Sequence, residues 1–269
     1  MNIAKLGLSE LLAALALPPA ALVQQRVPKK MLAENGAPTL ADRKLVQDRI
    51  EELIWHAALK PTNVGIAAYE DELRSYLEVA VLIAKLRTDP AIDSQRTPQA
   101  AKVSTSVKRA AELVHRAIPY PTVLLLEDGQ QLVASMTHIR WAQREAEKTV
   151  LDGDSIIVPI TSAAAPEAFL DAMAVNKQPS SHLQALYQGW FDTLSAWQAV
   201  ELTGQFKASE SPAQAAERRA ALHACKDLDA RIATARSAAV KEKQIARQVA
   251  ANLEIKALLA ERLRIAQSL

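Results

Sequence analysis

The chain has 269 residues, and 49% of them are hydrophobic, so it can bury a sizeable core without disulfides or a structural metal. Its formal net charge is only +2, which is too small for a strong attraction of the whole molecule to nucleic acid. The single cysteine, Cys225, excludes an internal disulfide framework and a cysteine-rich zinc site, and it fits a reducing compartment.

The first predicted element is a helix over Ile3–Leu17, which Pro18 and Pro19 end. Only one Lys precedes the apolar stretch Leu11–Leu17, so the segment is a poor match to a signal peptide. No run of about 18 apolar residues occurs in the chain, which argues against a membrane span. The cytoplasm is therefore the expected location.

A basic segment, Arg26-Val27-Pro28-Lys29-Lys30, follows between two predicted helices. Pro28 cannot continue a helix, so the segment is expected to be an extended strand or a turn that presents its three cations together. Such a segment binds phosphates or acidic partner surfaces, or else it is a solvated linker.

The next predicted helix begins at Thr39, whose side chain can form a weak capping box with Asp42. Its apolar residues recur at three- and four-residue intervals: Leu45, Val46, Ile50, Leu53 and Ile54. The helix is expected to end before Pro61, and Lys60-Pro61-Thr62-Asn63 is typical of a turn.

Ser75–Arg87 is dense in β-branched and large apolar residues, which predicts a central strand buried on both faces. A helix follows, with Thr97 as its N-cap and Pro98 at its first position, and it ends near Ile118.

A β-hairpin is predicted from two strand-like segments, Thr122–Glu127 and Gln131–Trp141, because Asp128-Gly129 between them is a strong two-residue turn signal. A last strand is expected over Ser155–Ile160, after a turn at Asp152-Gly153. The order β–α–β–β–β, with antiparallel pairing of the last three strands, predicts an α+β fold with a small, mainly antiparallel sheet and flanking helices.

Beyond the last strand only helices are predicted, so we place a domain boundary between an α/β head (residues 1–162) and a helical C-terminal region (residues 163–269). Pro166 opens a short helix, and a capping box at Ser181–Gln184 opens a second. A third helix starts at the capping box Ser211–Gln214, and no Gly or Pro interrupts it, so it can run unbroken to the end of the sequence.

The third helix carries a heptad seam with two charged interruptions. Its members are Cys225, Leu228, Ile232, Ala235, Ala239, Glu242, Ala246, Val249, Leu253, Lys256, Ala260 and Leu263. Small Ala residues favour close helix approach, so a helical hairpin or a coiled-coil arm is predicted. Packing against the chain's own helix of Trp190 and Trp197 is the alternative.

No common catalytic or cofactor motif occurs: Walker A, the dinucleotide-binding glycine pattern, Gly-x-Ser-x-Gly and His-Glu-x-x-His are absent. The five histidines stand singly, without a second ligand at helical spacing. We therefore expect no cofactor, no metal and no enzymatic activity. A divergent metal-dependent nuclease would have to use Asp71, Glu78 and Lys85, which lack the compact acidic-x-Lys triplet.

Three ordered motifs resemble a bacterial and archaeal family known only as domain of unknown function 4391. The family's Ile-Pro-Lys-Lys signature is similar to Arg26–Lys30. Its tryptophan and the proline turn that follows are similar to Ile54-Trp55 and Leu59–Asn63. The entry to its hairpin, Ile-Pro-Tyr-Pro, is similar to Ile118–Pro121, which Leu124–Glu127 follow. The resemblance covers about Gln24 to Ile160. The turn is one residue tighter than in the family, and the first strand lacks the family's alternating acidic residues.

The resemblance implies a context, because such proteins are typically encoded beside ATP-dependent helicases and DNA methyltransferases in anti-phage defence clusters. The first hypothesis is therefore a non-catalytic accessory subunit that docks a helicase or a DNA methyltransferase, with no membrane involved. The residues expected to bind a partner or a phosphate are Arg26, Lys29, Lys30, Trp55, Lys60, Asn63 and Tyr120.

A second hypothesis is a direct DNA-binding module that uses Lys29, Lys30 and Arg43 together with the basic helical arm. From Lys207 to the end, twelve basic residues stand against seven acidic ones, although a solvated helix surface explains this as well. The possible DNA contacts on the arm are Arg218, Arg219, Lys241, Lys243 and Arg247. The divergent nuclease is the third hypothesis.

Overall fold

The computed structural model of the chain describes residues 6–88, 103–129, 131–142, 148–160 and 166–269. The chain divides into two compact units, which we call the sheet unit (Met1–Leu194) and the hairpin unit (Ser195–Leu269). Our predicted boundary at residue 162 marks the change from strands to helices, whereas the division into compact units falls later, within the helix α8 (Leu183–Thr203).

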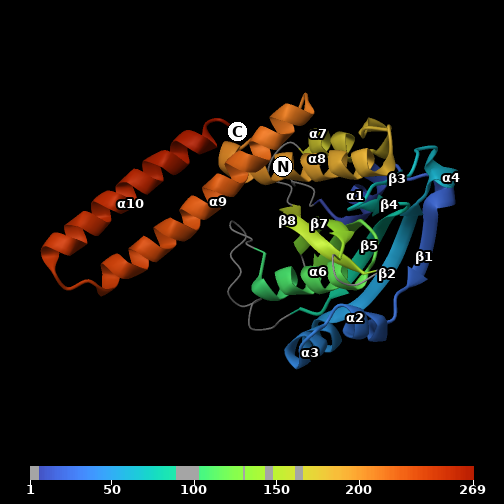
Figure 1. Cartoon of the computed structure of the whole chain (residues 1–269), viewed down its shortest axis with the longest axis horizontal. Helices are drawn as coiled ribbons and strands as arrows, with labels where there is room; N and C mark the ends of the chain where they lie inside the picture. The colour runs from blue at the N-terminus through green and yellow to red at the C-terminus, as the bar shows by residue number, and fades with distance from the viewer. Residues whose placement is uncertain (1–5, 89–102, 130, 143–147, 161–165) are drawn as a thin grey trace, which may run out of the picture. The chain divides into compact units, whose positions relative to one another are not determined.

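The sheet unit is built on a six-stranded sheet with the order β1-β2-β5-β6-β7-β8 (Figure 1). All neighbours are antiparallel except β5 and β6, which are parallel. This confirms the predicted α+β class and the mainly antiparallel sheet. The strands are β1 (Leu22–Arg26), β2 (Ile50–Leu59), β5 (Val79–Leu86), β6 (Thr122–Asp128), β7 (Gln131–Trp141) and β8 (Thr149–Ile160), and a separate short pair is β3 (Tyr69–Glu70) and β4 (Ser75–Tyr76).

The predicted central strand is confirmed for Val79–Leu86, because β5 lies between β2 and β6 and six consecutive residues, Val79–Ala84, are buried. Its predicted start is wrong, since Ser75 and Tyr76 form β4 of the separate pair. The helix α6 (Thr105–Ala117) connects it to its parallel neighbour β6. The predicted hairpin of β6 and β7 is also confirmed, and Gly129 in its turn has a φ of 62°, a conformation that favours glycine.

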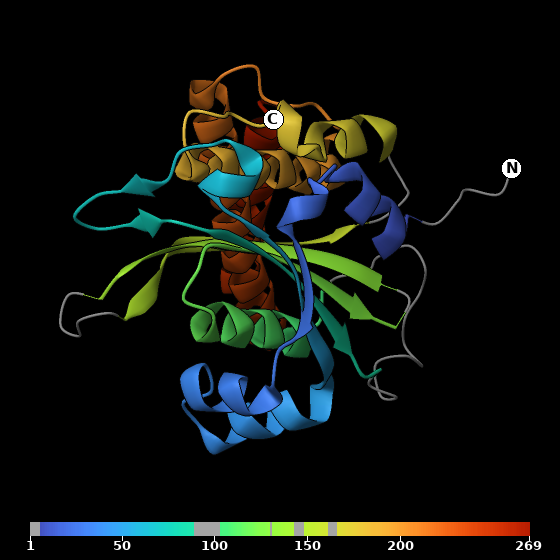
Figure 2. The same ribbon diagram turned by 90° about the vertical axis from the view of Figure 1, so that its right-hand side faces the viewer.

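Helices cover both faces of this sheet (Figure 2). On one face lie α2 (Lys29–Asn35), α3 (Leu40–Arg49) and α6, which bury a continuous apolar core with alternate residues of β5 and β6. On the other face lie α1 (Leu8–Ala14), α7 (Pro166–Met173) and the first part of α8. The remaining short helices are η1 (Pro19–Ala21), α4 (Pro61–Val64) and η2 (Val175–Lys177).

Two buried hydrogen-bonding groups hold α8 in place. The Tyr187 hydroxyl donates to a main-chain carbonyl of the sheet, Thr137 O at 2.7 Å, and accepts from the Thr137 amide at 3.1 Å. The Trp190 Nε1 donates to Met173 O at 2.8 Å and so joins α8 to α7. Both side chains are fully buried, so each satisfied polar atom avoids the cost of an unpaired group in the core.

The predicted helix from Thr39 is correct only in its first half. Its capping box forms, with the Asp42 amide donating to Thr39 Oγ1 at 3.1 Å, but α3 ends at Arg49 and β2 begins at Ile50. The three-residue spacing of buried Ile50 and Leu53 fits a helix, but pairing with β5 decides for a strand, and a register irregularity between Ile50 and Glu52 accompanies this spacing.

One predicted turn and part of the basic segment differ in the structure. The predicted Asp152-Gly153 turn lies inside β8, where Gly153 has a φ of 75° beside a register irregularity with β7. The expected extended conformation of the basic segment holds for Arg26, which ends β1, and for Pro28, but Lys29 and Lys30 are helical because α2 begins at Lys29. The predicted N-cap Thr97 and the first residues of the predicted N-terminal helix lie outside the described residues, and the described α6 has Ser104 as its N-cap.

The hairpin unit confirms the predicted helical hairpin, although not as one unbroken helix. The helix α9 (Pro212–Lys241) is capped by Ser211, as predicted, and residues 242–244 separate it from α10 (Ile245–Ala266). Leu228 and Ile232 of α9 pack with Leu258 and Ile265 of α10. The predicted seam is therefore correct in α9 and wrong in α10, because the break changes which side of the second helix faces the first.

Candidate functional site

Two aromatic residues of the predicted site meet at one end of the sheet. Trp55 lies on β2 and Tyr120 lies just before β6, with ring centroids 5.7 Å apart at 72°, an edge-to-face contact. Trp55 packs against the core, and its buried Nε1 has no hydrogen-bond partner among the described residues. Tyr120 is exposed. The packed ring of Trp55 therefore supports the solvent-accessible ring of Tyr120.

The predicted turn residues Lys60 and Asn63 have different roles. The Lys60 Nζ forms an ion pair of 3.0 Å with the largely buried Glu78, and the hydrogen bond to this carboxylate raises the pKa of Lys60. The Asn63 amide closes the turn, since its Oδ1 accepts from the Lys60 amide at 2.8 Å and its Nδ2 donates to Ala58 O at 2.9 Å. Asn63 thus shapes the segment that presents Lys60.

A small pocket of about 80 Å³ adjoins Tyr120. Its lining comes from four places in the chain: Ser75, Leu77, Pro119, Tyr120, Ile139, Arg140, Trp141 and Thr149. Two exposed apolar side chains, Leu77 and Tyr120, line this pocket. Exposed Leu73 adjoins it through its carbonyl, which accepts from the Trp141 amide at 2.8 Å, and exposed Val150 follows Thr149 on β8 and lines the larger pocket. We call Leu73, Leu77, Tyr120, Trp141 and Val150 the Tyr120 surface.

Charged residues border the Tyr120 surface. Arg74 donates to Asp152 Oδ2 at 2.5 and 3.0 Å, and Arg140 lies 3.5 Å from the other carboxylate oxygen. Asp71 holds the adjoining β3–β4 turn, because it accepts from the Tyr69 hydroxyl and from the amides of Leu73 and Arg74, and these bonds hold its pKa below the usual value. The apolar surface therefore has an ordered polar rim.

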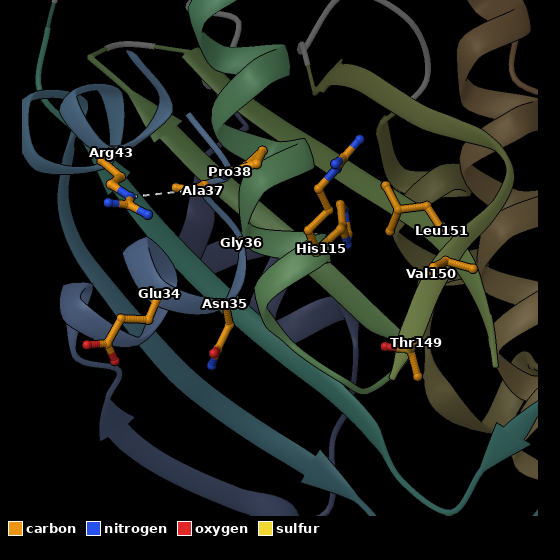
Figure 3. Close-up of a pocket in the computed structure, with 11 residues that line it drawn as sticks. Glu34, Asn35, Gly36, Ala37, Pro38, Arg43, His115, Thr149, Val150 and Leu151 are labelled. Atoms are coloured by element: carbon orange, nitrogen blue, oxygen red, sulfur yellow. Dashed lines mark hydrogen bonds between the residues drawn. The ribbon is translucent and has the colours of Figure 1, made fainter. Parts of the chain in front are cut away.

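A larger pocket of about 490 Å³ lies beside the C-terminal end of α6 (Figure 3). The segment from Glu34 to Pro38 forms one side, and Thr149–Leu151 of β8 form the other. Its two guanidinium groups already have acceptors, since Arg43 donates to Ala37 O at 3.4 Å and Arg116 pairs with Glu112 at 2.7 Å. Thr149 lines both pockets, so the two are neighbours on the sheet unit.

His115 lines the larger pocket and is a residue whose role the sequence did not reveal. Its Nε2 lies 2.9 Å from Ser135 Oγ, and burial lowers the pKa of its imidazole to about 4. The ring is therefore neutral near neutral pH. The apolar periodicity of α6 could have indicated this burial, because Leu113, Val114 and Ala117 around it are buried too.

The basic residues at the start of the sheet unit have separate partners. Arg26 lies 3.5 Å from Glu52, and Lys30 lies 3.8 Å from Glu34. Lys29 donates to Gln47 O at 3.4 Å, near the C-terminal end of α3, where a cation is favoured, while burial and the nearby Arg87 lower its pKa. Two of the three predicted cations are thus paired with carboxylates.

The predicted arm residues divide into two groups. Arg218 is buried and donates to Ser209 Oγ at 2.6 Å, and Arg219 is half-buried. Lys241, Lys243 and Arg247 are exposed around the turn between α9 and α10. The hairpin end therefore presents three cations to solvent.

The three candidate nuclease residues are engaged elsewhere. Asp71 stabilises a turn, Glu78 pairs with Lys60, and Lys85 pairs with Glu51 at 3.0 Å. Within the described ranges no group of three or more His, Cys, Asp or Glu residues is arranged to hold a metal ion. Nor is any helix in those ranges long and apolar enough to cross a membrane.

The fold and the site define an α+β protein in which helices cover both faces of a mixed sheet, with an exposed aromatic surface at one end of that sheet and a C-terminal helical hairpin. The chain belongs to the family described as domain of unknown function (DUF4391), whose model matches residues 15–261 and so includes most of the hairpin unit. No curated protein and no solved structure matches the chain.

Proposed function

We propose that the chain is a non-catalytic subunit that docks a protein partner through the Tyr120 surface. The observation that carries the proposal is that exposed Leu77 and Tyr120 line one small pocket with Trp141, while exposed Leu73 is hydrogen-bonded to Trp141 and exposed Val150 follows the lining residue Thr149. Contiguous apolar patches with a polar rim mark interaction sites on soluble domains. The sheet unit's other exposed large apolar residues, Leu22 and Leu40, lie apart from this surface, at the start of β1 and at the start of α3.

The geometry suits an anchor that is already in place before binding. Tyr120 lies between Pro119, whose own φ is fixed, and Pro121, which restricts the backbone of the residue before it, and Trp55 supports the Tyr120 ring edge-to-face at 5.7 Å. A side chain that is held before binding loses little entropy when the partner arrives. The ion pairs Lys60–Glu78 and Arg74–Asp152 lie outside this anchor and supply partner selectivity rather than most of the affinity.

The partner class comes from the family resemblance. It implies a helicase or a DNA methyltransferase of an anti-phage defence cluster, bound in the cytoplasm, and an apolar aromatic surface fits a protein partner better than a phosphate backbone. The basic arm then adds either a second contact with this partner or a contact with its DNA.

The Tyr120→Ala variant tests the proposal. We expect it to weaken binding of the helicase or methyltransferase encoded beside the chain by about 30-fold or more, because truncation of a central aromatic anchor costs about 2 kcal/mol or more. The measurement is co-purification of the full-length tagged chain with each candidate, after nuclease treatment and washes at low and high salt, followed by titration of the retained partner.

Leu40→Ala is the matched control, because Leu40 is 82% exposed and outside the Tyr120 surface. It should bind as the unmodified chain does. Equal retention of the partner by Tyr120→Ala, or failure of both candidates to bind the unmodified chain, would contradict the proposal.

Direct DNA binding is the second candidate function, and the three exposed cations at the hairpin turn favour it. If Lys241, Lys243 and Arg247 contact phosphates, replacing all three with Glu should reduce the slope of log affinity against log salt by about 3. Fluorescence anisotropy with a labelled duplex measures this slope. No duplex binding at low salt, or an unchanged slope in the triple variant, would argue for protein docking alone.

A further inference from the structure

The helix α10 carries two apolar stripes, and only one of them faces α9. The inner stripe consists of Ala251, Ile255, Leu258, Arg262 and Ile265, which are all buried or half-buried. Leu258 and Ile265 pack with α9, and Arg262 forms a two-fold hydrogen-bonded ion pair with Asp229 of α9, at 2.5 and 3.0 Å. The spacing 4-3-4-3 is that of a heptad seam.

The second stripe, which we call the outer stripe, is exposed. Ile245 is 79% exposed, Val249 53%, Leu253 63%, Leu259 40% and Leu263 59%. At 100° per residue these side chains lie about 140° around the helix from the inner stripe. The stripe is about 27 Å long at 1.5 Å per residue. A helix with apolar residues on two sides is stabilised when each side packs against another helix, and within the hairpin only α9 covers one side of α10.

We propose that the outer stripe binds the outer stripe of a second copy of this chain, in antiparallel orientation about Glu254. This arrangement places Ile245 opposite Leu263 of the partner subunit and Val249 opposite Leu259 of the partner subunit, so every large apolar residue except the central Leu253 faces another. The stripe is therefore complementary to itself, which is the requirement for a two-fold symmetric interface.

The charges of the stripe select the orientation. Lys256 is the charged residue within the exposed outer stripe, and Asn252 lies one turn before it. In the antiparallel pairing Asn252 faces Lys256 of the partner subunit, and its amide oxygen can accept from the ammonium group. A parallel pairing would oppose the two lysines, which is unfavourable. Ala246 and Ala260 on the flank allow the helices to approach closely.

The test measures the mass of the full chain by light scattering and sedimentation over a micromolar concentration range. The unmodified chain should be a dimer. Val249→Glu should raise the dimer dissociation constant by about 100-fold or more, because two carboxylates would then be buried against leucine. Adding Leu259→Lys to the same chain should restore the dimer, since the antiparallel register places each new carboxylate beside a new ammonium group.

Ala250→Glu is the matched control, because Ala250 is exposed on α10 but outside both stripes. It should remain a dimer, and helicity from circular dichroism should be equal in all variants. A monomeric unmodified chain, or a dimer that survives Val249→Glu, would overturn the proposal. A double variant that stays monomeric would overturn the antiparallel register. Tyr120→Ala should dimerise normally, so this result is independent of the proposed partner docking.

Discussion

Replacing Asp128 with alanine should lower the free energy of unfolding by about 3 kcal/mol, because it leaves the largely buried guanidinium of Arg49 without this counter-ion. Asp128 ends β6 and is 1% exposed, and its Oδ1 accepts from Arg49 Nη2 at 3.1 Å. Arg49 ends α3 and also donates to the Arg87 carbonyl, while its Nε is buried with no partner among the described residues. The pair thus joins a helix end to two strands.

Urea unfolding followed by circular dichroism measures this loss. Asp128→Asn should be less destabilising, because the amide oxygen still accepts a hydrogen bond from Arg49 although the charge is lost. The double variant Arg49→Met with Asp128→Leu should recover most of the stability, since it removes both charges and fills the space. A single Asp128→Ala variant as stable as the unmodified chain would show that Arg49 finds another counter-ion.

The stability of the sheet unit should also fall by about 3 kcal/mol as the pH decreases from about 6.5 to about 4, because of His115. Burial lowers the pKa of this imidazole from an ordinary value of 6.5 to about 4 in the folded chain. Between these values the unfolded chain binds a proton that the folded chain does not, so acid favours unfolding. Above the unfolded pKa the contribution is fully present.

In the His115→Gln variant the free energy of unfolding should depend less on pH, because the glutamine amide can still form a hydrogen bond with Ser135 but does not titrate. His56 is the comparison, since it is only half-buried and its pKa is lowered to a smaller degree by burial. His56→Gln should therefore retain most of the slope. Urea midpoints measured from pH 4 to pH 7 test both variants, and an unchanged slope in His115→Gln would contradict a neutral buried imidazole.

The two proposed surfaces would give the chain distinct tasks. The Tyr120 surface belongs to the sheet unit and would recognise a different protein, whereas the outer stripe of α10 belongs to the hairpin unit and would bring two copies together. A dimer doubles the number of docking surfaces, so a partner with two copies of its own would be bound more tightly by avidity.

Much of the local structure followed from residues that act through their neighbours in sequence. The Thr39 and Ser211 caps, the glycine turn at Asp128-Gly129 and the apolar run of β5 each predicted the element that forms. The reason is that caps, turns and burial on both faces depend on a few adjacent side chains. The capping signals at Thr39 and Ser211 were correct, but the one at Ser181–Gln184 was not, because α8 begins at Leu183 and its first turn is capped by His182, whose Nδ1 accepts from the Ala185 amide at 3.1 Å.

By itself the sequence determined the α+β class, the central β5, the β6–β7 hairpin and a helical C-terminal region, in which the hairpin of α9 and α10 was one of several open arrangements. Only the tertiary structure decided that Ile50–Leu59 is a strand, that Trp55 meets Tyr120, and which side of α10 faces α9. These three features depend on contacts between residues that are distant in sequence. An apolar run can form a helix or a strand, and pairing with a neighbouring strand decides which. The break at residues 242–244 changes the phase of the heptad pattern, so the pattern of α9 does not predict the buried side of α10.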